Sequence, residues 1–500
     1  MLFCLLLFWF QNPTAAAKEH ASRGLELTKS GQLQSAETEL REAVRLVPND
    51  AFSLALLGVV LGRQQKLTEA DIYLERALKI DPADITSRFN LAVNQFRLGK
   101  LTESKSNLER VLKDQPGTAP AVLVLGTVLE RLGDYRRAAG LLETVPDLVR
   151  RQPESVAALA RSYCRTSRRE KERETLDWLA TAGPQTVFLG GKTAAQCGDF
   201  EYAQKLFRSI QSTFPDKAAL IYEIALVDYN AGHFAEARTA LQPLIAAGTR
   251  DAKIFNLLSW CYHREKRPED AVAAMKQAIA LEPAAEINYD HLAQILMEEG
   301  NFTGAYETAK QAIALAPGSA SAYKLRGHAE SRLGFFKQAL ESYLKAEKLG
   351  SEDADLLLGL GSVQQKLFQP AAAAATFEKG IARYPSDAQL YQAYGRMLLE
   401  PGPKRDQAAE SRAVTLLKKA LELDNALPNA HYELGNFWLE SDKAAEALPH
   451  LQAAAKLDPA SGRIHLALAN CYRRLGRSAD AQHELELFRK LGKQEGREAN

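Results

Sequence analysis

A segment of about 34 residues repeats along nearly the whole chain, and this repetition restricts the fold more than any other feature. Residues 51–84 show the unit most clearly. Leu54 and Leu61 share one face of a first helix, and Leu74 lies on the apolar face of a second. Pro82 then ends the second helix, because its ring disfavours helical backbone at the residue before it. Two helices this short cannot bury their apolar faces alone, so each unit requires neighbours on both sides.

Later copies of the unit keep small residues at its eighth, twentieth and twenty-seventh places, where they allow two helices to cross closely. They also keep proline at its thirty-second place. Examples are Gly58, Ala70 and Ala77; Ser259, Ala271, Ala278 and Pro283; and Ala293, Ala305, Ala312 and Pro317. The pattern resembles the tetratricopeptide repeat (TPR). The resemblance implies an all-α fold, a right-handed α-solenoid of about fourteen TPR helix-turn-helix repeats, with first helices lining a concave groove.

The repeats are expected to start at regular places. These are near residues 17, 51, 85, 119, 153, 184, 218, 252, 286, 320, 354, 388, 428 and 462. We therefore divide the chain into residues 1–17, a signal peptide or N-terminal apolar segment; 18–152, repeats 1–4; 153–217, irregular repeats 5–6; 218–387, repeats 7–11; 388–427, repeat 12 with a proline-rich insertion; and 428–500, repeats 13–14 and a polar C-terminal tail.

Three repeats depart from the regular pattern. The second helix of repeat 4 is expected to end at Val145-Pro146. In repeat 5 the charged residues 167–174 stand where a tight turn is expected, and no small residue fills the twentieth place. In repeat 12 a loop around Pro401 separates the two helices, and its role is left open.

Residues 2–10, LFCLLLFWF, form an apolar run that is too short to span a bilayer as a helix. The small residues Ala15 to Ala17 follow it, as at a signal-peptidase site. We expect cleavage near Ala17, hence a periplasmic or secreted protein with no membrane span in the mature chain. No Lys or Arg precedes Leu2, which departs from a signal peptide, so a cytoplasmic location remains the alternative and Met1 need not be the true start.

The sequence offers little for catalysis. Residues 190–193, Gly-Gly-Lys-Thr, resemble the end of a phosphate-binding loop, but the first glycine of that motif and a preceding strand are missing. Gly191 is therefore interpreted as the small residue at the eighth place of repeat 6. The histidines are scattered through different repeats. We expect no enzyme activity, no cofactor and no metal.

The five cysteines form no CxxC pair, which argues against a structural zinc site. Cys164 and Cys197 lie near the ends of first helices in adjacent repeats, so they either form a disulfide or pack as free thiols. Cys261 and Cys471 lie many repeats apart and should not meet.

The resemblance implies that side chains at fixed places of each first helix face the groove. The second residue of the helix is one of these places. The candidate groove residues are Arg63, Phe96, Arg97, Arg131, Arg161, Arg165, Lys192, Tyr222, Tyr229, Asn256, Trp260 and Arg264, with Lys324 and His328 among those of later repeats. Acidic residues are few there, so the groove favours an acidic peptide, because arginine binds carboxylates bidentately. The alternative is that the arginines follow the helix dipole, which favours cations at helix C-termini. The aromatic residues either anchor a ligand or fill the space between first helices.

We therefore expect a non-catalytic scaffold or adaptor that binds a protein or peptide partner, exported and acting in a bacterial envelope assembly. A net charge of +1 gives no reason to expect nucleic acid as a partner. The alternatives are a cytosolic adaptor, a cell-wall polysaccharide binder, and the regulatory repeat region of a transferase without its catalytic domain. The partner, the biological process and the oligomeric state are left open.

Overall fold

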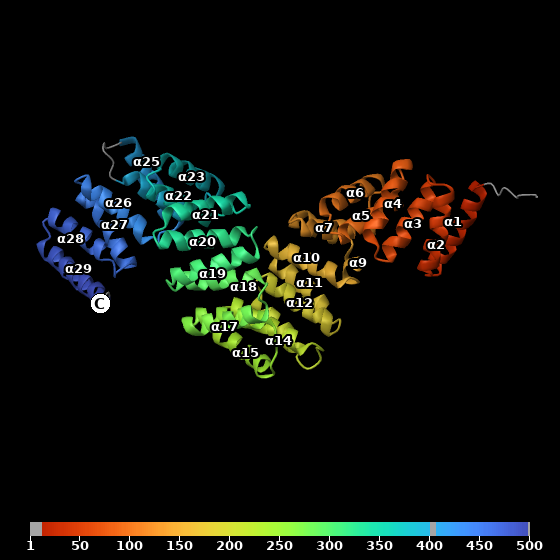
Figure 1. Cartoon of the computed structure of the whole chain (residues 1–500), viewed down its shortest axis with the longest axis horizontal. Helices are drawn as coiled ribbons and strands as arrows, with labels where there is room; N and C mark the ends of the chain where they lie inside the picture. Colours follow the sequence, from red (N-terminus) through yellow and green to blue (C-terminus); the bar gives the residue numbers. More distant parts are fainter. Residues whose placement is uncertain (1–12, 401–406, 499–500) are drawn as a thin grey trace, which may run out of the picture. The chain divides into compact units, whose positions relative to one another are not determined.

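The computed structural model describes residues 13–400 and 407–498, which form 29 α-helices and no strand (Figure 1). Apart from α9, the 28 remaining described helices form fourteen consecutive pairs, and each pair packs on the next within residues 1–248 and within residues 249–500. This confirms the expected all-α architecture of consecutive helix pairs. The predicted apolar run 2–10 and most of the loop around Pro401 lie outside the described residues.

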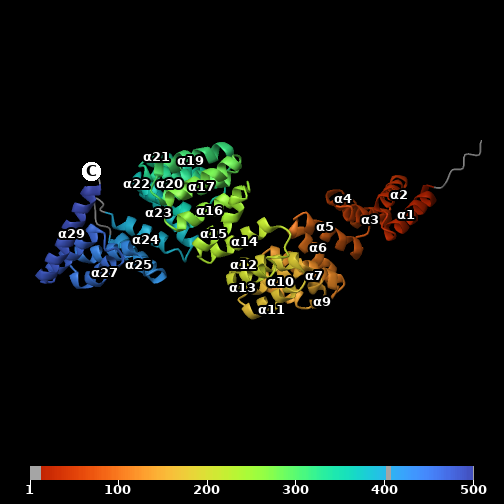
Figure 2. The same ribbon diagram turned by 90° about the horizontal axis from the view of Figure 1, so that it is seen from below.

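The helices fall into two compact units, residues 1–248 and residues 249–500. Unit 1 contains α1 (Pro13–Lys29), α2 (Leu33–Leu46), α3 (Ala51–Arg63), α4 (Leu67–Ile80), α5 (Ile85–Arg97), α6 (Leu101–Asp114), α7 (Ala119–Arg131), α8 (Tyr135–Leu142), α9 (Pro146–Arg150), α10 (Pro153–Arg165), α11 (Arg169–Ala180), α12 (Pro184–Gln196), α13 (Phe200–Ser209), α14 (Lys217–Asn230) and α15 (Phe234–Ala246). Unit 2 contains α16 (Ala252–Arg264), α17 (Pro268–Leu281), α18 (Glu286–Glu298), α19 (Phe302–Leu315), α20 (Ala320–Arg332), α21 (Phe336–Lys348), α22 (Ala354–Lys366), α23 (Pro370–Arg383), α24 (Ala388–Leu399), α25 (Gln407–Leu423), α26 (Pro428–Glu440), α27 (Ala444–Leu457), α28 (Gly462–Arg474) and α29 (Ser478–Glu498). Figure 2 shows helices of a pair, such as α1 and α2, side by side in the turned view.

Small residues allow the two helices of a pair to approach closely. A Cβ atom added to Gly58 on α3 would lie 2.6 Å from Cγ of Leu74 on α4. Ala70 and Ala77 are buried in the same pair. The eighth, twentieth and twenty-seventh places of the repeat therefore have the packing role that the sequence pattern predicts.

Aspartates before the first helices are a signal that the sequence analysis missed. Asp50 accepts a hydrogen bond from the Ser53 backbone N–H at 2.9 Å, and Asp84 accepts one from Thr86 at 3.0 Å. Such N-caps satisfy backbone donors that the first turn of a helix leaves unpaired. The last place of one repeat therefore fixes where the next repeat begins.

The fourth and fifth repeats are irregular, but not entirely as expected. Helix α8 ends at Leu142 and the short helix α9 begins at Pro146, so the expected early end is present and an unexpected helix follows it. The expectation that charge replaces the turn in repeat 5 is wrong. Ser167 has φ 61° and makes the turn, and α11 begins at Arg169. Charged residues of this kind are good helix formers, so charge alone did not mark a loop.

The chain ends also differ from the expected boundaries. Helix α1 begins at Pro13, so the predicted cleavage site near Ala17 lies inside a helix. Helix α29 runs to Glu498, through most of the expected polar tail, whose Lys, Gln, Glu and Arg residues favour helix. No helix in the described residues has both the length and the apolarity that a bilayer crossing requires.

Candidate functional site

The candidate cations of unit 1 lie on consecutive first helices, α3, α5, α7, α10 and α12. The guanidinium carbon of Arg131 on α7 lies 4.5 Å from the ring centroid of Phe96 on α5. Arg63 on α3 donates to the Thr28 carbonyl of α1 at 3.4 Å. These contacts link neighbouring first helices, and a shared surface of all the candidate cations stays a prediction. We call this the first-helix surface of unit 1.

Two of the candidate cations are already neutralised inside the protein. Arg161 donates from Nε to Oε1 of Glu130 at 2.7 Å and from Nη2 to Oε2 at 3.2 Å. Nζ of Lys192 lies 3.0 Å from Oε1 of Glu223. These pairs join α7 to α10 and α12 to α14, so they connect first helices and leave less charge for a ligand.

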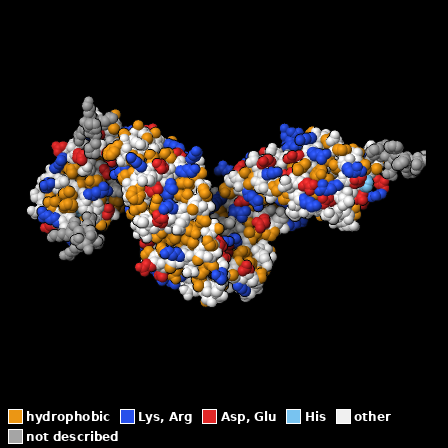
Figure 3. All heavy atoms as spheres, in the orientation of Figure 1, with side chains coloured by type: hydrophobic (Ala, Val, Ile, Leu, Met, Phe, Trp, Pro, Cys, Tyr) orange, Lys and Arg blue, Asp and Glu red, His pale blue; other side chains and the backbone are white. Residues whose placement is uncertain are grey.

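Three other arginines have no such carboxylate. Arg97, Arg131 and Arg165 are exposed, and no described residue forms an ion pair or hydrogen bond with them. Each is the last residue of its helix, so the helix dipole favours a cation at all three places. We call these three residues the open arginines. Figure 3 shows charges of both signs interspersed over the visible face of each unit.

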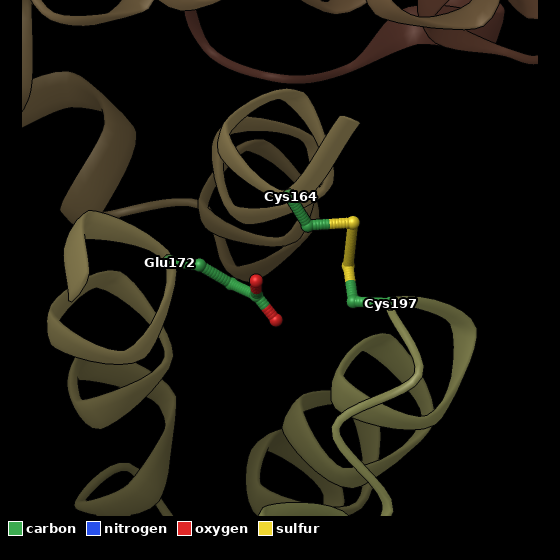
Figure 4. A group of neighbouring side chains, drawn as sticks. All are labelled: Cys164, Glu172 and Cys197. Atoms are coloured by element: carbon green, nitrogen blue, oxygen red, sulfur yellow. A yellow bond between two sulfur atoms is a disulfide. The ribbon is translucent and has the colours of Figure 1, made fainter. Parts of the chain in front are cut away.

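A cavity of about 190 Å³ lies beside the open arginine of α10. It is lined by Glu130, Tyr135, Arg161, Cys164, Arg165, Gln196 and Cys197. Cys164 and Cys197 form a disulfide, with Cα atoms 5.8 Å apart (Figure 4). This decides between the two alternatives that the sequence left open. Cys261 and Cys471 are buried and are not joined by a disulfide, as expected.

The predicted aromatic residues pack within their own units. The ring of Tyr229 on α14 lies 5.4 Å from that of Phe234, and Tyr222 on the same helix is half-buried. In unit 2 the Trp260 ring lies 5.4 Å from the ring of His291. The hypothesis that these aromatic residues anchor a ligand stays a prediction.

The remaining two candidates are on α16. Asn256 donates from Nδ2 to Oδ1 of Asn288 on α18 at 2.8 Å, so it links two first helices. Arg264 is exposed at the end of α16.

Unit 2 has a larger cavity, of about 490 Å³, between first helices α18, α20 and α22. Nζ of Lys324 lies 3.4 Å from Oδ2 of Asp355, and Nε2 of His328 lies 3.0 Å from the same oxygen. The hydrogen bond from His328, and the nearby Lys324 charge, lower the pKa of Asp355 to about 2. Lys324 and His328 are candidates from the sequence, whereas Asp355 was not predicted, although it occupies the second place of its repeat. This cavity is internally charge-paired, unlike the open arginines.

A buried histidine and a half-buried one, His431 and His450, give unit 2 a predicted pH dependence. Nδ1 of His431 lies 3.1 Å from Nδ1 of His450, and burial lowers the pKa of both below the usual value of about 6.5. The unfolded chain therefore binds more protons than the folded chain below about pH 6.5, so stability falls as the pH falls through this window. We expect the melting temperature of unit 2 to drop between pH 7.5 and pH 5, as measured by circular dichroism.

The His450→Gln variant is the control for this pH dependence, because it removes one titrating ring of the pair and keeps a polar side chain. Its melting temperature should change less with pH than that of the wild type. Equal pH dependence in both proteins would contradict the assignment to this pair.

The chain matches family models described as Tetratricopeptide repeat. The matches cover residues 22–85, 89–155, 222–286, 267–320, 291–354, 324–388 and 439–495. A curated relative, Protein CTR9 homolog of Arabidopsis thaliana, is 24% identical over 284 residues, which are 53% of this chain and 25% of that protein. The chain thus spans about a quarter of the length of this relative.

Three solved structures are also similar to this chain. The APC/C hetero-tetramer Cut9-Hcn1 structure has a chain with 14% identity and a TM-score of 0.43, over 92% of this chain and 97% of that one. Yeast Tom70 has 17% identity and a TM-score of 0.37, over 88% and 92%. YrrB, titled a TPR protein with an unusual peptide-binding site, has 23% identity and a TM-score of 0.30, over 38% and 94%.

Proposed function

Since the chain belongs to the tetratricopeptide repeat family, we propose that it is a non-catalytic scaffold that binds an acidic segment of a protein partner. The segment binds along the first-helix surface of unit 1. The observation that carries this proposal is the row of open arginines, Arg97, Arg131 and Arg165, at equivalent ends of α5, α7 and α10. Their guanidinium groups are exposed and have no carboxylate from the described residues.

The chemistry of arginine favours carboxylates as the ligand groups. A guanidinium group presents paired N–H donors that match a carboxylate, and such charge-assisted bonds are about twice as strong as neutral ones. The ring of Phe96 beneath Arg131 adds an apolar surface beside the charge. An extended segment with acidic side chains interspersed among apolar ones therefore fits this surface best.

Reversing the three charges tests the proposal. Exposed ion pairs contribute up to about 1 kcal/mol each. The combined variant Arg97→Glu, Arg131→Glu, Arg165→Glu should therefore lose about 3 kcal/mol, or weaken binding about 100-fold. Fluorescence anisotropy with a labelled peptide of alternating Glu and Leu measures this loss at low ionic strength, and the matching Gln–Leu peptide shows the charge dependence.

A matched control reverses three exposed cations of second helices, Lys79, Lys113 and Arg136. This variant carries the same total charge change on the second helices α4, α6 and α8 of unit 1, so it should bind the peptide as the wild type does, apart from long-range repulsion. If both variants weaken binding equally, the effect is one of net charge. If the arginine variant binds normally, the helix-dipole account explains the open arginines.

We also propose that the protein is exported and acts in a bacterial envelope assembly. The apolar run 2–10 followed by small residues near Ala17 supports export. The Cys164–Cys197 disulfide agrees with an oxidising compartment. N-terminal sequencing of the protein from its host should find Lys18 as the first residue; an intact Met1 in the cytosolic fraction would refute export.

A further inference from the structure

Three side chains from three helices meet beside the 190 Å³ cavity. Cys164 lies at the end of α10, Glu172 near the start of α11, and Cys197 just after α12. Their two sulfur atoms and one carboxylate oxygen lie within 4.8 Å of one another. Figure 4 shows the Glu172 carboxylate between its own helix and the two cysteines. We call these residues the Cys-Cys-Glu cluster.

Glu172 is the unexpected member of the cluster. It occupies the twentieth place of its repeat, where Ala70 and Ala271 stand in regular repeats. Its side chain is 0% exposed. Oε2 accepts a hydrogen bond from Arg169 at 3.0 Å, but Oε1 is buried with no hydrogen-bond partner among the described residues. Burying a polar atom without a partner costs free energy, so packing alone does not explain this residue.

We propose that the Cys-Cys-Glu cluster, once its disulfide is reduced, binds a thiophilic divalent cation such as Zn²⁺. The ligands are Sγ of Cys164, Sγ of Cys197 and a carboxylate oxygen of Glu172. This inference is independent of the proposed peptide binding. It makes the disulfide and the bound metal mutually exclusive states of one site.

The reaction balances as two steps. A dithiol reductant donates two electrons and two protons to the disulfide, which becomes two thiols, and the reductant becomes a disulfide. The cation then displaces the two thiol protons, because the thiolate is the ligand form. Conversion of the disulfide into the metal-bound site therefore requires only a dithiol reductant and the metal ion.

The dimensions of the cluster suit this cation. Zn²⁺ is bound at about 2.3 Å by sulfur and about 2.0–2.2 Å by carboxylate oxygen, so ligand atoms of a tetrahedral site lie about 3.5–3.8 Å apart. The cluster spans no more than 4.8 Å, so small side-chain rotations suffice after the S–S bond breaks. Cys164 and Cys197 line the cavity, so a water molecule from it would complete an open three-ligand site.

The surroundings also supply compensating charge. Two thiolates, one carboxylate and a divalent cation leave one net negative charge. The guanidinium of Arg169 bonds Glu172 directly, and Arg165 lines the adjacent cavity without a carboxylate of its own. This proposal departs from the expectation that the chain binds no metal. That expectation rested on the absence of CxxC spacing and on scattered histidines, and neither pattern detects ligands that come from three separate segments of the chain.

The test uses the full-length protein and Co²⁺ as a spectroscopic probe. The protein is reduced with a phosphine, freed of reductant under nitrogen and titrated. We expect a thiolate-to-cobalt charge-transfer absorption that saturates at one equivalent, disappears on adding Zn²⁺, and is absent from the oxidised protein. Failure of the folded protein to be reduced, or reduced protein without this absorption, would overturn the proposal.

Variants separate the metal site from a purely structural role. Glu172→Ala installs the small residue of regular repeats, so it should fold and yet bind Co²⁺ at least about tenfold more weakly. Cys164→Ser should weaken Co²⁺ binding more than Glu172→Ala does. Cys261→Ala in unit 2 should bind Co²⁺ as the wild type does. Wild-type affinity in Glu172→Ala would remove Glu172 from the ligand set and overturn the three-ligand site. A weaker affinity with unchanged circular dichroism supports it.

Discussion

The Phe207→Ala substitution is expected to lower the free energy of unfolding of the α12–α13 region by about 3–5 kcal/mol. Phe207 lies on α13 and is 0% exposed. Its ring fills the space over Gly191, where an added Cβ atom would collide with it. The ring of Phe188 lies 5.6 Å away. Truncation leaves a cavity, and the two helices cannot easily close it because their neighbours hold them in place. The loss in free energy of unfolding therefore lies at the upper end of the range for truncated core residues.

The loss should be local, because each repeat of a solenoid contacts only its neighbours. Amide hydrogen exchange should therefore quicken most in α12 and α13, and little in unit 2. Phe52→Ala is the matched control, since Phe52 is on α3 of the same unit and is 53% exposed. We expect that control to change stability by about 0.5 kcal/mol or less. Equal losses in the two variants would contradict the packing role of Phe207.

The interpretation of Gly191 shows what the sequence could predict. Its neighbours resemble part of a phosphate loop, but the repeat register assigns it to the eighth place, and the structure packs it against Phe207. The same register predicts where first helices begin. Helices α16, α18 and α20 begin at Ala252, Glu286 and Ala320, the expected residues. The period is readable because the two helices of every pair need small residues at the same places to pack closely.

Side-chain partners were less predictable than helix positions. The register places Arg161 and Arg165 on one helix face, but only the structure shows that Glu130 neutralises the first and not the second. Likewise, the missing small residue in repeat 5 was visible as an irregularity, whereas the burial of Glu172 beside a disulfide was not. Such contacts depend on rotamers and on helices that are distant in sequence, which a periodic pattern does not encode.

Removing the Cys164–Cys197 cross-link is expected to destabilise the region of α10 to α12 by about 3–4 kcal/mol. The two cysteines are 33 residues apart, and closing a loop of that length restricts the unfolded chain by about this amount. Urea unfolding and hydrogen exchange in α11 measure the loss. Cys164→Ala, Cys197→Ala and the double variant should lose nearly the same free energy, because any one of them breaks the cross-link.

This equality is the decisive comparison. Losses that add in the double variant would mean that each cysteine acts through its own packing, since independent sites are additive and a shared bond is not. The reduced wild type should match the three variants without metal. On addition of Zn²⁺ it should regain stability, because a cation bound only by the folded state adds to the free energy of unfolding. The variants lack a ligand and should regain little, so one set of unfolding curves distinguishes a cross-link, a packed pair of thiols and a metal site.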